Sequence, residues 1–550
     1  MHRFLATSMG KSGYIVINSW MLLALAFLAL SACSSLPKDI ERPSEQFALP
    51  PATTGILADI GSTIAQSHGS GASGFWLLDK NADALTWRLA LIDQATASLD
   101  LMYYIWYADD SGGMLLERVI RAAERGVKVR LMIDDLLLIG RDRTLVALDQ
   151  IPNIQLRVFN PLKNREVGRG VEFIARLDTL NSRMHDKLLI ADNHAAILGG
   201  RNIGDHYFGL GKKYNFHDLD VLGFGEVARQ SSSMFDNFWN SSWVIPAAAL
   251  PAQVDQQFIT DGRDRLQRAV KAAETLTGFP VEPRDWSIEL AELGPNLHFG
   301  VSEVIFDRII DGELVREMVD TLGRSLRAAD QEILLMNAYI IPDQDFIDGM
   351  KKLTDRGVQI RILTNSLATY DLPIVNAHYK KWRKPIVEAG AELFELRHDA
   401  VVKSRVDTAP VNSKYIGFHS KAYVVDRRHV FIGSMNFDPR SANINTEMGI
   451  LIDSPSLGEA LARLAARDMA PQNAWQVMLD DRQKLIWVNS DETVTKQPAR
   501  NTWQRFMDGL LRLLPKSQAQ EDSMCPNPLT LANHIEFQRC FLYSYNSPPV

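Results

Sequence analysis

Two short segments repeat the same spacing of residues that are suited to phosphoryl chemistry. Each reads His-x-Lys, then four apolar or small residues, then Asp. The copies consist of His185, Lys187 and Asp192, and of His419, Lys421 and Asp426. An imidazole offers a nitrogen nucleophile, and an ammonium offers a fixed charge for oxygens on which negative charge gathers. Because histidine supplies only 12 of 550 residues, the repetition predicts one site with two histidines.

Each motif has the pattern of a β-strand. Alternate side chains of a strand share a face, so His185 and Lys187 are expected to point the same way, as are His419 and Lys421. The apolar run after each lysine indicates a buried continuation of the strand. Asp186, between the first histidine and lysine, is expected to face away from the site.

Further residues follow the motifs in matching order. Gly-Gly-Arg-Asn occupies 199–202, Gly-Ser-Met-Asn occupies 433–436, and Asn-Thr-Glu occupies 445–447. Together with the paired motifs, these segments closely resemble the HKD motifs of the phospholipase D superfamily, and in detail the bacterial cardiolipin synthases. The resemblance runs from about Ala95 to about Pro515.

The resemblance implies a fold class and a reaction. The expected fold is α/β, with two pseudo-symmetric phospholipase D-like α/β/α sandwich halves, mixed central sheets and the active site at their interface. The expected reaction is phosphatidyl transfer through a phosphohistidine, with His185 as the nucleophile and His419 as the general acid and base. No metal and no cofactor are expected. The groups expected to hold the phosphoryl oxygens are Lys187, Lys421, Asn202 and Asn436.

A working imidazole also needs a carboxylate that fixes its tautomer. By resemblance, Glu447 is expected to serve His419, and Asp218 to serve His185. Ser434 supplies a hydroxyl for phosphate or backbone contact, whereas the first copy has Gly200 in its place.

Asp192 and Asp426 complete the motif. We expect them to hold its architecture rather than to transfer protons. The alternative is that each is an ordinary acid at the end of a strand.

The periodicity predicts an internal duplication of a strand–helix–strand unit. Each unit implies a right-handed crossover between parallel strands. The first unit spans 98–106, 114–125 and 127–134, and the second spans 332–340, 346–355 and 356–364.

Composition favours a globular protein. The chain is 46% apolar and 23% charged, with a formal net charge of −7. The net acidity weighs against a non-specific nucleic-acid binder, and no nucleic-acid partner is expected.

The predicted organisation is a signal peptide (1–32), a flexible tether (33–75), domain 1 (76–250), a connector (251–310), domain 2 (311–490), and a C-terminal amphipathic helix and tail (491–550).

The N-terminal segment has the features of a targeting signal. An apolar run over 21–30 leads into Leu-Ser-Ala-Cys, which resembles a lipoprotein lipobox with Cys33 as the lipidated residue. Ser34 follows this cysteine, and a serine at this position resembles the pattern of lipoproteins sent to the outer membrane. The folded part of the protein would then face the periplasm. The alternative is an uncleaved inner-membrane anchor with a periplasmic domain.

Two features near the C-terminus have open interpretations. Cys525 and Cys540 form a disulfide in an oxidising compartment, or they are two free thiols. A predicted helix with apolar positions from Trp503 to Leu514 lies on a bilayer or packs on its own protein. Residues 161–182 and 398–416 precede the motifs without clear periodicity, as loops that line a pocket do.

Four functions remain open. The leading hypothesis is a cardiolipin synthase-like transferase that moves a phosphatidyl group to phosphatidylglycerol, with phosphatidylglycerol, phosphatidylethanolamine or cardiolipin as substrates. The second is a phospholipase D that releases phosphatidic acid. The third is an exported phosphodiesterase or nuclease, and the fourth is a non-enzymatic envelope protein that binds lipid. No partner protein is predicted.

Overall fold

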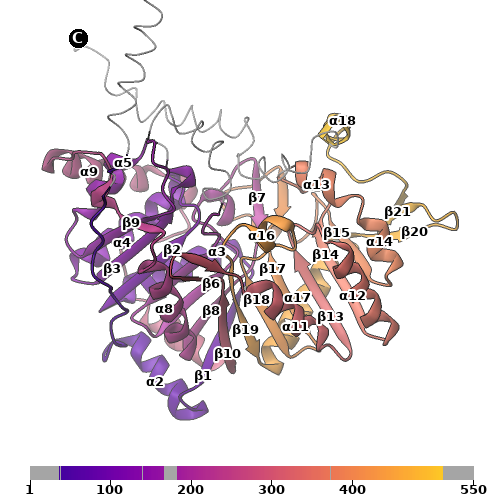
Figure 1. The fold of residues 1–550 in the computed structure, drawn as a ribbon, viewed down its shortest axis with the longest axis horizontal. Helices are drawn as coiled ribbons and strands as arrows, with labels where there is room; N and C mark the ends of the chain where they lie inside the picture. The colour runs from indigo at the N-terminus through magenta and orange to yellow at the C-terminus, as the bar shows by residue number, and fades with distance from the viewer. Residues whose placement is uncertain (1–35, 38, 139, 166–181, 372, 512–550) are drawn as a thin grey trace, which may run out of the picture.

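A computed structural model describes residues 36–37, 39–138, 140–165, 182–371 and 373–511 (Figure 1). Cys33, Cys525, Cys540 and most of the loop over 161–182 lie outside the described residues, so the expectations about them remain predictions.

The duplicated unit is present in both halves. Its helices begin at capping aspartates, since Asp109 accepts a hydrogen bond from Gly112 N and Asp343 accepts one from Phe346 N. Within each unit the two strands pair in parallel, as predicted. The units are β2 (Ser98–Tyr103), α4 (Asp110–Glu124) and β3 (Lys128–Asp134), and β13 (Glu332–Asn337), α12 (Gln344–Asp355) and β14 (Gln359–Asn365).

Strand pairing gives both halves the same order. In the first half the order is β9 (Val244–Pro246), β4 (Ile154–Phe159), β3, β2, β5 (Lys187–Ala191), β6 (Ala195–Gly199), β8 (Asp220–Gly225) and β1 (Ala72–Leu78). In the second half it is β20 (Ala474–Leu479), β15 (Glu392–Leu396), β14, β13, β17 (Lys421–Val425), β18 (His429–Gly433), β19 (Met448–Asp453) and β10 (His298–Phe306). The motif strands β5 and β17 therefore occupy equivalent central places.

The two sheets are continuous. β1 pairs antiparallel with β10, so the last strand of one half hydrogen-bonds to the last strand of the other. β21 (Leu485–Val488) and β22 (Thr493–Val494) extend the sheet beyond β20. The expected two-half α/β architecture is confirmed, with the mixed sheets joined edge to edge.

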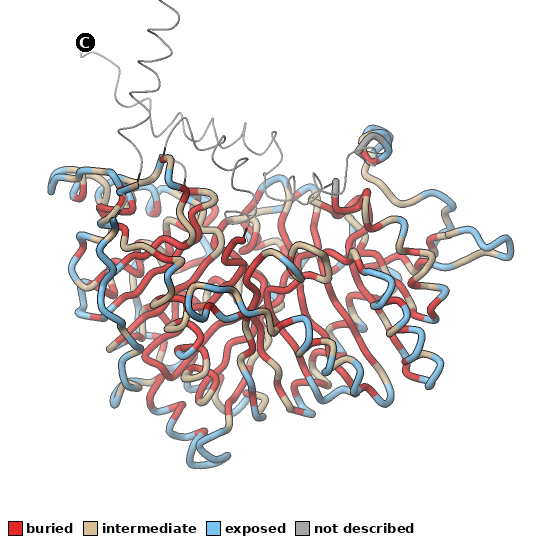
Figure 2. The backbone as a smooth tube through the Cα atoms, in the orientation of Figure 1, coloured by how far each residue is buried: buried red, intermediate tan, exposed pale blue. Residues whose placement is uncertain are grey.

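Helices cover both faces of the sheet. α8 (Glu226–Trp239) and α17 (Pro455–Met469) enclose one hydrophobic core that draws on both halves. Each half has a second core on its other face. Figure 2 shows buried backbone running across the strands of both halves, with exposed residues mainly at the periphery. The shared core indicates that the halves pack as one unit.

The other helices lie around this frame. They are α2 (Ile56–His68), α3 (Asn81–Gln94), α5 (Asp142–Asp149), α9 (Gln256–Ala272), α10 (Ser287–Leu293), α11 (Met318–Arg327), α13 (Pro373–Tyr379), α14 (Arg383–Glu388), α15 (Lys403–Val406), α16 (Pro439–Asn443) and α18 (Thr502–Leu511). Within the described ranges, no helix combines the length and the apolar character needed to cross a bilayer.

Two predicted segment boundaries were wrong. The tether predicted over 33–75 contains α2 and the start of β1, because Leu57, Ile60 and Ile64 are buried against the first half. The connector predicted over 251–310 contains β10, which is a strand of the central sheet. Both segments lack long apolar runs, so their packing was not evident from local sequence.

Candidate active site

The two motif segments meet at the junction of the halves. His185 immediately precedes β5 and His419 immediately precedes β17. The backbone N–H of His185 donates to Thr446 O of the other half, and the N–H of His419 donates to His217 O of the first half. Parallel pairing of β7 (Tyr214–His217) with β16 (Tyr415–Phe418) continues the second contact. Backbone pairing therefore carries each histidine across the boundary.

Each histidine is held by a carboxylate from the opposite half. His185 Nδ1 lies 3.0 Å from Glu447 Oε2, and His419 Nδ1 lies 2.6 Å from Asp218 Oδ2. A carboxylate only accepts, so Nδ1–H donates and Nε2 is left with the lone pair for chemistry. The expected pairing of Glu447 with His419 and of Asp218 with His185 was wrong. The cross-strand contacts place each acid beside the histidine of the other half.

Both lysines lie with their histidines, as the spacing predicted. Lys187 Nζ donates to His185 O at 2.6 Å, and Lys421 Nζ donates to His419 O. Both ammonium groups are buried. The charge of Glu447 acts on both lysines, which indicates that the two motifs share one electrostatic environment.

Burial sets the protonation of this site. It lowers the pKa of His419 to about 4 and the pKa of His185 well below 6.5. Burial also lowers the pKa of Lys187 to about 7 and of Lys421 to about 8. Both imidazoles are therefore neutral at pH 7, as a nucleophile and a general base require.

The two carboxylates differ in ionisation. Burial raises the pKa of Glu447 to about 7. Asp218 is also buried, but its pKa lies below the usual range because the interaction with His419, which donates a hydrogen bond to it, and the positive charges of Lys421 and Arg201 outweigh burial. Asp218 is ionised throughout the neutral range, whereas Glu447 changes charge within it.

Asp192 and Asp426 lie at the far ends of the motif strands from the histidines. Asp192 accepts hydrogen bonds from the backbone N–H groups of Thr96, Ala97 and Ser98. Asp426 accepts from those of Asp330, Gln331 and Glu332. These contacts agree with the expectation that the two aspartates hold the architecture of the motif rather than transfer protons.

The asparagines are not equivalent. Asn202 Oδ1 accepts from Ile105 N, and its amide nitrogen donates to the Tyr207 hydroxyl at 2.9 Å. Asn436 Oδ1 is buried with no hydrogen-bond partner among the described residues, as is Glu447 Oε1. An unpaired buried polar atom costs about 1–3 kcal/mol, so these atoms indicate a place for a ligand.

The structure explains the difference between Gly200 and Ser434. The Ser434 hydroxyl donates to Glu447 Oε2. A Cβ at Gly200 would lie 2.4 Å from Asp218 Oδ1, so a side chain there would displace the carboxylate from His419. Asp186 Oδ2 accepts a hydrogen bond from Thr446 Oγ1 at 2.6 Å, facing the other half.

Several residues that surround the histidines were not predicted from the sequence. The ring of Tyr104 lies 5.2 Å from that of His185, and Arg440 adds positive charge near this histidine. Arg183 is buried and donates to Asp134 at 3.1 Å. Asp307 Oδ2 accepts from Glu447 N and holds the segment that carries this acid. None belongs to a repeated motif, so no sequence signal marked them.

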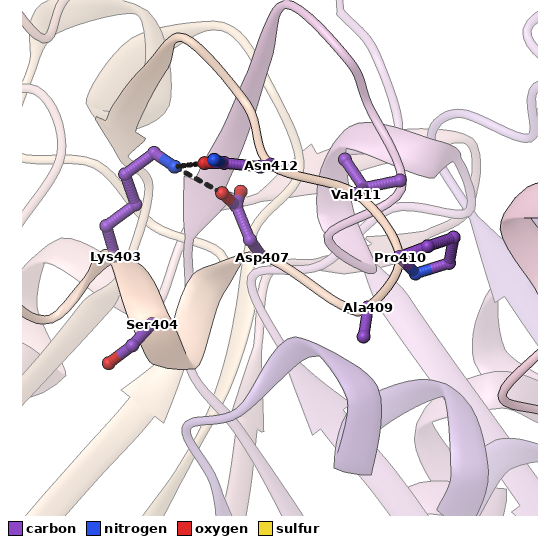
Figure 3. Close-up of a pocket in the computed structure, with 7 residues that line it drawn as sticks. All are labelled: Lys403, Ser404, Asp407, Ala409, Pro410, Val411 and Asn412. Atoms are coloured by element: carbon purple, nitrogen blue, oxygen red, sulfur yellow. Dashed lines mark hydrogen bonds and ion pairs between the residues drawn. The ribbon is translucent and has the colours of Figure 1, made fainter.

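A cavity of about 420 Å³ lies on the segment before the second motif (Figure 3). Its lining includes Lys403, whose ammonium points to Asp407 and Asn412. Asp407 also accepts from Asn215 of β7. None of the lining residues belongs to the histidine site, so this cavity is not the reaction centre.

Fold and site together define a class of protein: a duplicated α/β protein of the phospholipase D type, with one two-histidine site between its halves. Comparisons with known proteins agree. Residues 89–239 and 322–469 match the family described as cardiolipin synthase, PLD-like domain. The chain belongs to this phospholipase D-like family.

Individual relatives cover most of the chain. Cardiolipin synthase C of Escherichia coli (strain K12) is 33% identical over 468 residues, covering 82% of this chain and 96% of that protein. An uncharacterized protein of Helicobacter pylori (strain J99 / ATCC 700824) is 31% identical over 453 residues, with coverages of 80% and 88%. The crystal structure of phosphatidylserine synthase from Haemophilus influenzae Rd KW20 has a TM-score of 0.53 at 13% identity, with coverages of 82% and 95%, which shows the fold alone.

Proposed function

We propose that the protein is a phosphatidyltransferase that makes cardiolipin, with phosphatidylglycerol as the acceptor. The observation that carries the proposal is the pair of buried, neutral imidazoles, each tied through Nδ1 to a carboxylate of the other half and flanked by a lysine. Similarity to a cardiolipin synthase over most of both chains supports the choice of substrate class.

The first step transfers the phosphatidyl group to the enzyme. His185 Nε2 attacks the donor phosphorus and the bond to the headgroup oxygen breaks. The leaving alcohol takes its proton from the imidazolium form of His419, which the negative charge of the bound donor phosphate and of Asp218 favours over the free protein. Lys187, Lys421 and Asn436 hold the phosphoryl oxygens. The positive charge of Arg440 near His185 supports placing the anionic donor phosphate on that side.

The second step releases the phosphatidyl group to the acceptor. A hydroxyl of phosphatidylglycerol gives its proton to neutral His419 and attacks phosphorus, and the bond to His185 breaks. With water as the acceptor the same step yields phosphatidic acid, which is the phospholipase D alternative. A nuclease would need to bind a polyanion, and the net charge of −7 disfavours this.

Product analysis tests this function. Purified full-length protein is incubated with vesicles of phosphatidylglycerol, alone or with phosphatidylethanolamine, and the products are identified by mass spectrometry. We expect cardiolipin with release of glycerol or ethanolamine. Phosphatidic acid without cardiolipin would replace the transferase by a phospholipase D, and degradation of DNA or RNA with intact lipid would replace both.

Membrane association is part of the proposal. A lipid on Cys33 would anchor the protein, and Ser34 after it indicates an anchor in the outer membrane with the folded part facing the periplasm. The inner-membrane anchor remains the alternative. Mass spectrometry of the mature N-terminus distinguishes a diacylated cysteine from an uncleaved segment, and thiol titration with and without reductant tests the Cys525–Cys540 disulfide.

Helix α18 supplies a second membrane contact. Its polar side chains face the protein: Asp508 accepts from Asn376 Nδ2 at 2.6 Å, and Gln504 donates to Leu367 O at 2.6 Å. Its aromatic residues face outward, with Trp503 and Phe506 66% and 60% exposed and stacked on each other. The helix thus packs on the protein and presents rings that suit a bilayer interface.

Replacing these rings is expected to lower activity on lipid in vesicles and to leave activity on monomeric lipid nearly unchanged. In the Trp503→Ser/Phe506→Ser variant we expect turnover of vesicle lipid to fall about fivefold or more, because aromatic burial at the interface is lost. Turnover of a monomeric short-chain phospholipid should change less than twofold. The matched control is Ile288→Ser, 73% exposed on α10. Equal loss on both substrates would refute the membrane contact.

A further inference from the structure

The surroundings of the two histidines are not symmetric. Two residues before His185 stands Arg183, and two residues before His419 stands Gly417. A Cβ at position 417 would lie 3.1 Å from a Phe216 ring carbon and from Thr369 O, so the second half has no room for an arginine there. On the His185 side Arg183 is paired with Asp134 and Arg440 adds positive charge, whereas Gly417 leaves the His419 side open to aromatic rings.

Aromatic rings surround His419. The ring centres of Phe216, Tyr207 and Tyr339 lie 4.9, 5.3 and 6.5 Å from its imidazole. Lys421 Nζ lies 6.0 Å from the Tyr339 ring centre. These rings come from both halves and bury His419, which is 6% exposed.

One carboxylate lies next to this aromatic wall without taking part in the histidine pairs. The Tyr339 hydroxyl donates to Asp371 Oδ1 at 2.6 Å. The charge of Asp371 reaches both His419 and Lys421. In the described part of the chain, Asp371 is half-buried, its Oδ2 accepts no hydrogen bond, and it forms no ion pair. The nearby Arg500 instead donates to Tyr370 O and lies over the Tyr415 ring.

We propose that Asp371, positioned by Tyr339, binds a hydroxyl of the acceptor headgroup and so makes the enzyme prefer an alcohol to water. The inference rests on the proposed transferase function and adds the group that selects the acceptor. A carboxylate is an acceptor of hydrogen bonds only, and a glycerol headgroup offers two hydroxyl donors.

The geometry gives the two hydroxyls separate partners. One gives its proton to His419 Nε2 and forms the new bond to phosphorus while the bond to His185 breaks. The other donates to Asp371 Oδ2 and holds the headgroup in place. Water has no second oxygen, so it cannot be held at Asp371 by one hydroxyl while another hydroxyl attacks phosphorus. The carboxylate therefore favours attack by the polyol.

The subsite is tested by how the phosphoenzyme divides between two reactions, transfer to an alcohol and hydrolysis by water. Full-length wild type and Asp371→Asn are given phosphatidylglycerol vesicles, and the ratio of cardiolipin to phosphatidic acid is measured together with total donor consumed. We expect the ratio to fall about tenfold in the variant, because a hydrogen bond to a charged group is lost. Tyr339→Phe, which frees Asp371 but keeps the ring, should lower the ratio in the same direction.

Controls separate the possible failures. Asp348→Asn replaces an exposed carboxylate on α12 and should keep the wild-type ratio. A wild-type ratio in Asp371→Asn would overturn the subsite while leaving the transferase function standing. A wild type that makes no cardiolipin would overturn the function and the subsite together. In a parallel incubation with vesicles that also contain phosphatidylethanolamine, selective loss of this lipid as a donor in Asp371→Asn would overturn the subsite, since it would show that Asp371 instead binds the ammonium of the leaving group.

Discussion

His185→Ala and His419→Ala are each expected to lower phosphatidyl transfer by about 10⁴-fold or more, because the first removes the nucleophile and the second removes the proton carrier. The variants should differ in phosphoenzyme formation. With a donor whose leaving group needs no proton, such as a phosphatidyl nitrophenol, His419→Ala should accumulate an acid-labile phosphohistidine and His185→Ala should form none. Trapping with radiolabelled donor measures this difference.

The control for these variants is His398→Ala. This histidine is partly exposed, and its ring nitrogen lies 4.0 Å from Asp399 outside the site. It should keep full activity. A phosphoenzyme in His185→Ala but not in His419→Ala would reverse the assigned roles. Unchanged turnover in either variant would end the two-histidine mechanism.

The crossed carboxylates give the second large effect. Glu447→Gln and Asp218→Asn are each expected to lower kcat/KM by about 10³-fold. The carboxylate stabilises the protonated imidazole and favours the tautomer with its proton on Nδ1, whereas a neutral amide does neither. Their pH profiles should differ. Wild-type kcat/KM should rise with pH through about 7, as Glu447 ionises, and Glu447→Gln should lose this rise. Asp218→Asn should keep it, since Asp218 is already ionised.

Rising pH also removes positive charge from the site. Burial lowers the pKa values of Lys187 and Lys421 to about 7 and about 8, so kcat/KM should fall again above this range. The expected profile is a narrow bell. A profile that is flat from pH 6 to pH 9 in the wild type would contradict the proposed charges.

Stability measurements distinguish lost chemistry from lost fold. The folded-state pKa of Glu447 lies above its ordinary value of 4.5, so its contribution to stability is fully present below pH 4.5 and is lost as pH rises through 7. The loss is about 3 kcal/mol at pH 8. Glu447→Gln lacks this loss and should unfold in urea at pH 8 no more readily than wild type. A much less stable variant would attribute its low activity to unfolding.

Local spacing predicted much of the fold and the chemical groups of the site. Alternation along the chain placed His185 beside Lys187 and His419 beside Lys421, because a strand repeats every two residues. The repeated strand–helix–strand units predicted parallel pairs, and β2 with β3 and β13 with β14 form them. These features depend on neighbours within one element, which sequence patterns record directly.

The tertiary structure decided which groups act on each other. Glu447 reaches His185 and Asp218 reaches His419 because segments far apart in the chain pair across the junction. Asp371 lies beside the second motif, where the Tyr339 hydroxyl donates to it. The sequence determined the catalytic groups and the duplicated strands that carry them, whereas their partners depended on long-range strand pairing. That pairing is set by the packing of whole sheets, and no local spacing encodes it.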